Sequence, residues 1–265
     1  MQLKSLGLAT DLALIATRGR VVDRGTYVVA VTPEDPGYHY GNLLVLPGPP
    51  RPGTLVSSIE LFAREVAVDP AIRHVTLCWD GQAGDAGDGA AAELTTAGFE
   101  VDTTLVMTAH AVRPAAAPRD IELRTLAPDE LARAAELDFA ISGDQREAHR
   151  QFLHRRAAWF RDLLAQRVAQ FWGAFDDRTL VGSLGLVRLG RLGRYQDVQT
   201  AQSHRRRGIA AALLSVAAGE ALGAGAEQLV IKTLANSFAE RVYERAGFRT
   251  IERTVSACRA PAISG

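Results

Sequence analysis

The stretch from Tyr195 to Leu222 constrains the fold most, because it passes from a strand into a helix through a basic turn. Residues 195–200 have the character of a strand, and the alanine-rich residues 207–222 have that of a helix. The first backbone N–H groups of a helix lack intrahelical partners, so this turn favours a phosphate or pyrophosphate. Gly208 lets the backbone approach such an anion, and three arginines precede it. The spacing matches neither a Walker A loop nor a GxGxxG fingerprint.

Strands and helices alternate through the whole second half of the chain. Such alternation predicts a layered α/β or α+β unit. Asp144 is expected to cap the longest helix. We expect strands at 121–123, 168–175, 180–188, 195–200, 228–232 and 248–258, and helices after Pro128, from Asp144 to about Gln166, at 207–222 and at 237–246.

The first half has the same mixed character and is separated from the second by a proline- and alanine-rich segment. Residues 113–120, with Pro114 and Pro118, predict a linker between one domain at 1–112 and another at 121–265. A chain of 265 residues is comfortable for two domains. In the first we expect strands at 26–31, 42–46, 74–79 and 99–108, helices at 55–68 and 90–97, and a Gly/Asp loop at 81–89.

Charge and composition exclude several classes of protein. The formal net charge is zero, but residues 1–117 hold 8 basic and 13 acidic residues, net −5, and residues 118–265 hold 22 and 17, net +5. The second half therefore suits an anion, although the whole molecule has no field to attract nucleic acid or a membrane. Cys78 and Cys258 and the six histidines form no metal-site pattern. Without a membrane-length apolar run or a signal peptide, we expect a cytoplasmic protein with no metal.

Two motifs in the second half resemble those of the GNAT (GCN5-related) N-acetyltransferase superfamily. The first is Arg205-x-x-Gly208-x-Ala210 after a V-x-T strand. The second is Asn236 followed by Ala239-x-x-x-Tyr243-Glu244-x-x-Gly247-Phe248. Their order and separation are those of the family, and the resemblance covers roughly residues 121–258. It implies a mixed, mostly antiparallel central sheet flanked by helices, and acetyl-CoA as the acyl donor.

The resemblance also implies roles for single residues. Val198 and Thr200 match the strand positions that bond the pantetheine arm, and Asn236 matches a position further along it. Asn236 could equally cap the helix that follows. The turn expected to bind the pyrophosphate consists of Arg205, Arg206, Arg207, Gly208, Ile209 and Ala210. Taken by themselves, the three arginines would indicate only a solvent-exposed surface.

Acyl transfer from a thioester needs an oriented amine, a base, an oxyanion donor and an acid for the leaving thiolate. Tyr243 matches the family's tyrosine near the thioester sulfur and is the candidate acid, with a core tyrosine as the alternative. Asp197 is the candidate base because it lies on the strand beside the expected thioester. A water-mediated route or a carboxylate from the region 138–147 is an equal alternative.

A short segment of the first half is similar in sequence to the second motif. Residues 94–99 (LTTAGF) align with Tyr243 to Phe248 (YERAGF), and the order of elements repeats. The counterpart of the basic turn is acidic and glycine-rich, and Leu94 stands where Tyr243 supplies a proton. We therefore expect a tandem protein whose first domain is a degenerate GNAT-like copy that packs on the active one or shapes its acceptor site. An unrelated α/β domain is the alternative.

The sequence thus predicts an acetyl-CoA-dependent N-acetyltransferase that acts on a primary amine of a small molecule or peptide. The alternative is a non-enzymatic acyl-CoA sensor or interaction module. A homodimer is an expectation from the family alone. The arginine run lacks the interleaved aromatic residues expected of a nucleic-acid site. The acceptor itself is not encoded in any motif, since function belongs to the site and not to the fold.

Overall fold

The computed structural model describes residues 1–81 and 87–261 of the chain. The contacts within it divide the chain into two compact units. The boundary differs from the predicted linker, because residues 113–120 belong to the second unit and the end of the chain returns to the first. The first unit comprises Met1–Val106, Thr233–Ala235 and Ile251–Gly265, and the second comprises Met107–Lys232 and Asn236–Thr250.

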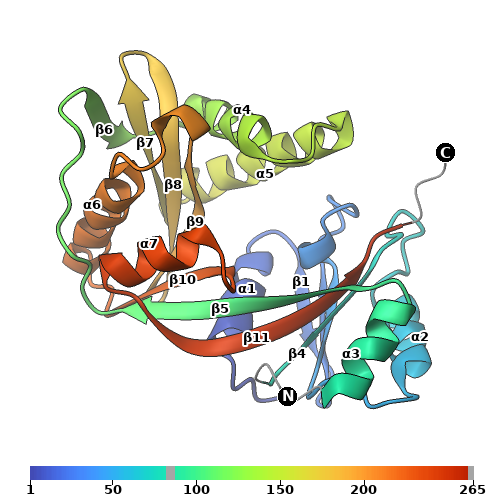
Figure 1. The fold of residues 1–265 in the computed structure, drawn as a ribbon. Coiled ribbons are helices and arrows are strands. Elements are labelled where there is room, and N and C mark those ends of the chain that lie inside the picture. Colours follow the sequence, from blue (N-terminus) through green and yellow to red (C-terminus); the bar gives the residue numbers. More distant parts are fainter. Residues whose placement is uncertain (82–86, 262–265) are drawn as a thin grey trace. The chain divides into compact units, whose positions relative to one another are not determined.

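The first unit is a mixed sheet with helices on both faces (Figure 1). Its strands lie in the order β1-β2-β3-β4-β11-β5. β3 and β4 run parallel, whereas β1 with β2, β2 with β3 and β4 with β11 are antiparallel. The elements are α1 (Leu6–Ile15), β1 (Arg20–Asp23), β2 (Val28–Val31), β3 (Leu43–Leu46), α2 (Leu55–Glu65), β4 (Val75–Trp79), α3 (Gly87–Thr96), β5 (Glu100–Ala109) and β11 (Arg249–Arg259).

The strands of this unit bury side chains on both faces. Leu44 and Leu77 pack with the α2 residue Phe62 in one cluster, while Val45 and Cys78 pack on the other face with α1. In a sheet covered on both faces, each strand is a continuous run of apolar residues. This explains why β3 (LLVL) and β4 (VTLCW) do not alternate apolar and polar side chains.

Helix α1 was not predicted, and distant residues complete its N-terminus. Asp80 accepts hydrogen bonds from the backbone N–H groups of Lys4 and Ser5, each at 2.8 Å. Glu252 accepts from the Ser5 hydroxyl and the Leu6 N–H, each at 2.7 Å. Both carboxylates are buried and stabilise the positive end of the helix dipole. Ser5 also caps the helix locally, since its hydroxyl accepts from the Leu8 N–H at 3.1 Å, but the two carboxylates come from positions 80 and 252, far away along the chain.

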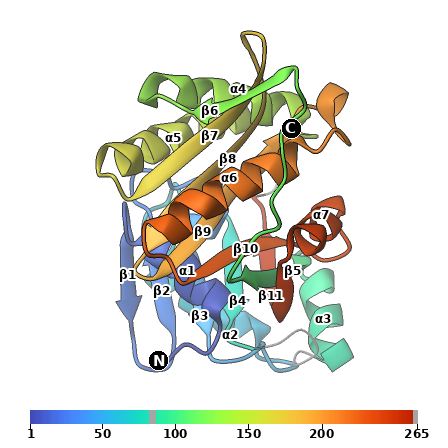
Figure 2. The same ribbon diagram turned by 90° about the vertical axis from the view of Figure 1, so that its left-hand side faces the viewer.

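The second unit has its sheet in the order β10-β9-β8-β7-β6, with α4 and α5 on one face and α6 on the other (Figures 1 and 2). β9 and β10 are parallel and the remaining neighbours antiparallel. This confirms the predicted mixed, mostly antiparallel α/β architecture. The elements are β6 (Ile121–Thr125), α4 (Leu131–Ile141), α5 (Glu147–Ala165), β7 (Ala169–Asp176), β8 (Thr179–Leu189), β9 (Leu192–Thr200), α6 (Ile209–Gly223), β10 (Gln228–Leu234) and α7 (Phe238–Ala246).

Two local predictions were wrong. Asp144 does not cap the long helix, because α5 begins at Glu147 with Arg146 at its N-cap. The Asp144 carboxylate instead accepts from the Arg146 backbone N–H at 3.0 Å and pairs with its guanidinium. The loop predicted at 81–89 is helical from Gly87 onward, while residues 82–86 lie outside the described part.

The same order of elements occurs twice along the chain. Three antiparallel strands, a helix, a strand parallel to the third, a helix and a further strand occur as β1 to β5 and again as β7 to β11. The repeated AGF also has one local geometry. Gly98 and Gly247 have φ of +80° and +109°, and the N–H groups of Phe99 and Phe248 both bond back five residues at 3.0 Å. This is the C-terminal cap in which glycine adopts the left-handed conformation.

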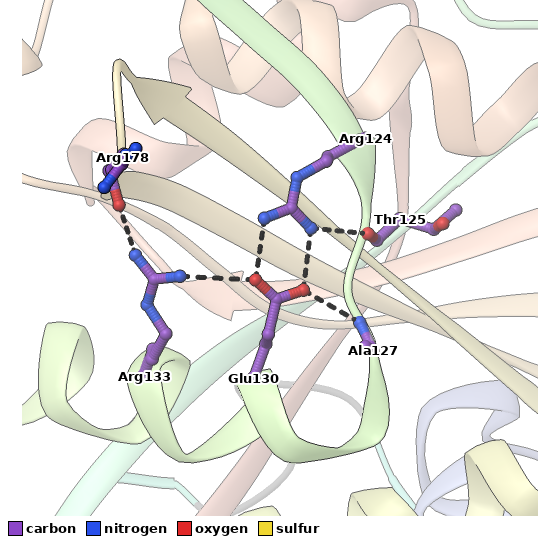
Figure 3. Close-up of polar contacts among 6 residues, drawn as sticks. All are labelled: Arg124, Thr125, Ala127, Glu130, Arg133 and Arg178. Carbon is purple, nitrogen blue, oxygen red and sulfur yellow. Dashed lines mark hydrogen bonds and ion pairs between the residues drawn. The ribbon is translucent and has the colours of Figure 1, made fainter.

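An ion-pair cluster fastens the edge strand β6 to the start of α4 (Figure 3). Glu130 accepts two hydrogen bonds of 2.7 Å from Arg124, one of 3.2 Å from Arg133 and one of 3.1 Å from the Ala127 N–H. The Arg124 guanidinium also lies 3.9 Å from the centre of the Phe175 ring. The hydrogen bonds from Arg124 lower the pKa of Glu130 to about 2.

We expect Glu130→Gln to lower the free energy of unfolding by about 1–2 kcal/mol at pH 7. Because the folded-state pKa is depressed, this stabilisation is complete above the unfolded value near 4.5 and is lost as the pH falls toward 2. Urea titrations at pH 7 and pH 2.5 measure the difference. Asp129→Asn, which removes an exposed neighbouring charge, is the control. Equal losses in both variants, or a loss that persists at pH 2.5, would contradict this role for Glu130.

Candidate active site

A β-bulge interrupts strand β9 at its centre. β9 pairs with β8 in regular register up to Gln196 and again from Gln199, so Asp197 and Val198 together face the single residue Leu184. Asp197 has φ of +47°, a left-handed conformation that short polar residues tolerate better than most. The sequence therefore places aspartate where the strand must absorb one extra residue.

The bulge changes the direction in which the side chains of β9 point. Tyr195 lies on the α6 face, where its hydroxyl donates to the Leu214 carbonyl at 2.9 Å. In a regular strand, residues two apart share a face. After the bulge, Asp197 and Gln199 instead line a cavity under α4 and α5, and the Gln199 amide donates to the Ala134 carbonyl at 3.0 Å. The bulge thus brings Asp197 to the face opposite Tyr195.

β9 also separates from β10 along the same stretch. The two strands pair from Leu192 with Gln228 to Arg194 with Val230. Within the described part of the chain, the pairing stops there, although β9 continues to Thr200. Residues 195–200 therefore present one backbone edge to the space between the diverging strands.

Three buried polar atoms lie unsatisfied on this separated stretch. The Gln196 Nε2, Gln199 Oε1 and Thr200 Oγ1 atoms have no hydrogen-bond partner among the described residues. Buried polar side-chain atoms are nearly always paired, so three within five residues is unusual. Nε2 donates, Oε1 accepts and the hydroxyl does both, so the stretch is prepared for a ligand or water with several polar groups.

The turn after β9 leads into the N-terminus of α6. Gly208 is the N-cap residue, with φ of +85°, and a Cβ added there would meet nothing within 4 Å. Arg206 also has a positive φ, +62°. The predicted helix start at residue 207 is early by two residues, because α6 begins at Ile209. The first N–H groups of α6, including those of Ile209 and Ala210, face this open space without intrahelical acceptors.

The three arginines of the turn are not equivalent. Arg207 donates to Asp120 at 2.5 Å, and this contact lowers the pKa of the Asp120 carboxyl. Arg205 donates weakly to the Thr200 carbonyl, at 3.4 Å. Arg205 and Arg206 are exposed. Arg207 is therefore partly neutralised, and Arg205 and Arg206 carry most of the charge that an anion would meet.

Tyr243 lies on helix α7, and Asn236 lies just before it. The pKa of Tyr243 is raised to about 12, mainly by burial, with the Arg194 charge lowering it and the Asp197 charge raising it. Its phenol therefore stays protonated at neutral pH. Asn236 has φ of +61° and donates its backbone N–H to Glu240 at 2.7 Å. It does not cap α7, because Ser237 does so by accepting from the Glu240 N–H at 3.2 Å.

Asp197 belongs to an ion-pair cluster that joins β9, α4 and α5. Arg156 Nη2 lies 3.1 Å from the Asp197 carboxylate and also contacts Asp138. Burial raises the pKa of Asp197, and the Asp138 charge adds to this, while Arg156 and Arg194 oppose it. A cavity of about 20 Å³, enough for a water molecule, adjoins Asp197 and Gln199. The site therefore holds a carboxylate of raised proton affinity beside room for water.

Comparison with known proteins identifies this arrangement. The acetyltransferase (GNAT) domain family matches residues 137–259, which include β9, the basic turn and α7. Residues 137–259 form a GNAT acetyltransferase domain. This GNAT domain makes the protein an acyltransferase, so the family match favours the enzyme over the sensor.

Solved GNAT structures share the fold of the chain. A GCN5-related N-acetyltransferase from Kribbella flavida is 18% identical, with a TM-score of 0.67 over 99% of this chain and 98% of its own. One from Sphaerobacter thermophilus is also 18% identical, with a TM-score of 0.61 over 91% and 83%. A tandem GNAT protein of the clavulanic acid biosynthesis pathway is 17% identical, with a TM-score of 0.53 over 83% of this chain and 76% of its own. A search of curated proteins found no significant match. Within the described residues, no helix has the length and apolar character needed to cross a membrane.

Sequence reasoning missed several residues of this candidate site. Arg156 and Gln199 were not singled out, and Asp138 entered only through the region 138–147. Asp138 reaches the site, whereas Asp144 pairs with its neighbour Arg146. The signal for Gln199 was its spacing of two from Asp197 on one strand. The sequence did not indicate a role for Arg156, because an arginine in a basic helix is expected to be exposed to solvent unless its partners are known.

The left-handed conformation at Asp197 predicts a difference between two substitutions. Both Asp197→Asn and Asp197→Ala remove the charge that faces Arg156, but asparagine tolerates the left-handed region better than alanine. We expect the alanine variant to be less stable than the asparagine variant by about 1 kcal/mol. Thermal or urea unfolding of the two variants measures this difference. Equal stabilities would mean that the bulge does not constrain the residue at 197.

Proposed function

We propose that this acyltransferase uses acetyl-CoA as its donor and a primary amine, on a small molecule or a peptide, as its acceptor. The observation that carries the proposal is the separated half of β9, where three unsatisfied buried polar atoms lead into an open helix N-terminus. A pantetheine arm alternates amide groups with short apolar links, and it ends in a pyrophosphate. A strand edge suits the amides, and a helix N-terminus suits the pyrophosphate.

The residues present fit such a donor. In this proposal the backbone groups of Val198 and Thr200 bond the pantetheine arm, and Asn236 bonds it further along. The pyrophosphate lies against the turn formed by Arg205, Arg206, Arg207, Gly208, Ile209 and Ala210. The open space at Gly208 supports this, because a side chain there would occupy the position of the anion.

The acyl thioester supplies an activated carbonyl carbon. The protein must then take a proton from the amine and give one to the departing sulfur. Asp197 is the proposed base, acting directly or through a water in the adjoining cavity, and its raised pKa makes it a stronger base than an ordinary carboxylate. Tyr243 is the proposed acid: its phenol is protonated at neutral pH, as an acid must be before the thiolate forms, although a pKa of about 12 makes it a weaker acid than an ordinary tyrosine. A backbone N–H near Val198 is the proposed oxyanion donor.

We further propose that the first unit is a degenerate GNAT-like copy without acyl-CoA chemistry. Its β3 and β4 stay paired through Leu46 and Trp79, and the Asp80 N–H continues the ladder to the Leu46 carbonyl at 2.9 Å. The corresponding β9 and β10 also have three residue pairs, but β9 continues from Tyr195 to Thr200 beyond the last of them. Leu94, the counterpart of Tyr243, is fully buried and has no proton to give. The closed strand pair supports a unit that cannot admit a pantetheine arm.

A titration of acetyl-CoA tests the donor site. We expect saturable binding to the wild type by calorimetry and a loss of at least about tenfold in affinity for Gly208→Glu, since the carboxylate repels the pyrophosphate. Gly190→Glu is the matched control, because Gly190 also has a positive φ of +62° in open space but lies in the β8–β9 hairpin. Equal losses in both variants, or no binding to the wild type, would refute the site.

Release of CoA in the presence of an amine panel tests the chemistry. With an active amine, Tyr243→Phe should lower kcat by about a hundredfold and leave acetyl-CoA affinity unchanged, because only the transferred proton is lost. Tyr27→Phe, which removes a phenol hydroxyl bonded to Glu65 at 3.1 Å in the first unit, should leave turnover unchanged. A sensor would bind acetyl-CoA, release no CoA with any amine and be indifferent to Tyr243.

A further inference from the structure

We propose, on the basis of the acetyl transfer proposed above, that Asp138 is a positioning residue for the base. By sharing Arg156 it keeps Asp197 from being fully neutralised, and so keeps that carboxylate able to accept the proton of the acceptor amine. In this step an N–H bond of the amine breaks and an O–H bond forms on Asp197, from which the proton passes to solvent.

The geometry places one cation between two carboxylates. Arg156 on α5 directs the same nitrogen, Nη2, to Asp138 on α4 and to Asp197 on β9. The contact with Asp138 is the shorter of the two, and that with Asp197 is 3.1 Å. All three side chains are between 22% and 25% exposed, so water screens them only in part. Two carboxylates with one guanidinium leave a net charge of −1 within the cluster.

Among the described residues, four charged or titratable groups act on Asp197 or lie close to it. Arg156 approaches from α5 and Asp138 from α4, while Arg194 lies on the same strand and Tyr243 on α7. Arg156 and Arg194 favour the ionised carboxylate, and burial and Asp138 oppose it. With Asp138 removed, both cations would act on Asp197 alone, and a carboxylate paired in this way is a weak base.

A second ion pair on the same two helices shows what an unshared arginine does. Arg150 donates two hydrogen bonds of 2.9 Å to the single carboxylate of Glu136, which also contacts His154. The pKa of Glu136 is lowered, with the Arg150 hydrogen bonds as the largest cause. Asp197, which is less exposed than Glu136, has its pKa raised, with burial as the largest cause and the Asp138 charge adding to it. Glu136 and Arg150 therefore provide a matched control within α4 and α5.

The test measures the protonation of Asp197 itself, without an acceptor. Protein with ¹³C-labelled aspartate is titrated by NMR, with Asp197→Asn used to assign the resonance. We expect Asp138→Asn to lower the pKa of Asp197 by about one unit, because Arg156 then serves one carboxylate. Arg156→Gln should raise it, and Glu136→Gln should leave it unchanged. The opposite directions of the first two shifts distinguish charge sharing from a general loss of structure.

Enzyme kinetics then connect the shift to turnover. The acidic limb of the pH profile of kcat should move down with the pKa of Asp197 in Asp138→Asn, and kcat at its plateau should fall about threefold, as expected for a weaker base. KM for the amine and affinity for acetyl-CoA should not change. An unchanged pKa of Asp197 in Asp138→Asn would overturn the proposal. So would a shifted pKa with an unshifted pH profile. A wild type that binds no acetyl-CoA would instead refute the proposed function, independently of the NMR result.

Discussion

The site depends on one backbone irregularity, the bulge at Asp197. The extra residue in β9 turns the strand so that Tyr195 packs against α6 while Asp197 and Gln199 face α4 and α5. The same half of β9 is the part that leaves β10. A regular strand would place Asp197 on the α6 face, with Tyr195. The bulge therefore sets the direction of the proposed base, within the half of β9 that leaves β10.

The two units show how the same order of elements can be open or closed. In the first unit β3 and β4 remain paired to their ends, and in the second β9 and β10 separate. The shared AGF is weaker evidence for a common origin than it looks, because both copies form the same glycine-dependent helix cap. Any helix that ends in this way prefers glycine followed by an apolar residue. The repeated strand and helix order is the stronger argument for a tandem protein.

Features that rest on local chemistry could be predicted from the sequence, and features that rest on distant partners could not. The strands, the basic turn and the family of the second half follow from patterns within a few residues of each other. Helix α1 was not predicted; two distant carboxylates, Asp80 and Glu252, complete its N-terminus beside the local cap from Ser5. Arg156 escaped because its partners lie 18 and 41 positions away along the chain, on α4 and β9. The prediction for Asp144 was wrong because its carboxylate bonds the backbone N–H of Arg146, which lies before the helix, and not an N–H group within it.

The central claim is that the separated half of β9 and the turn into α6 receive acetyl-CoA, while the closed pair in the first unit does not. Hydrogen exchange with and without saturating acetyl-CoA, followed by mass spectrometry, tests this directly. We predict slower exchange in peptides that cover residues 195–211 and no change in those that cover 43–46 and 75–80. Unchanged exchange at 195–211 despite saturable binding, or protection confined to the first unit, would contradict the claim.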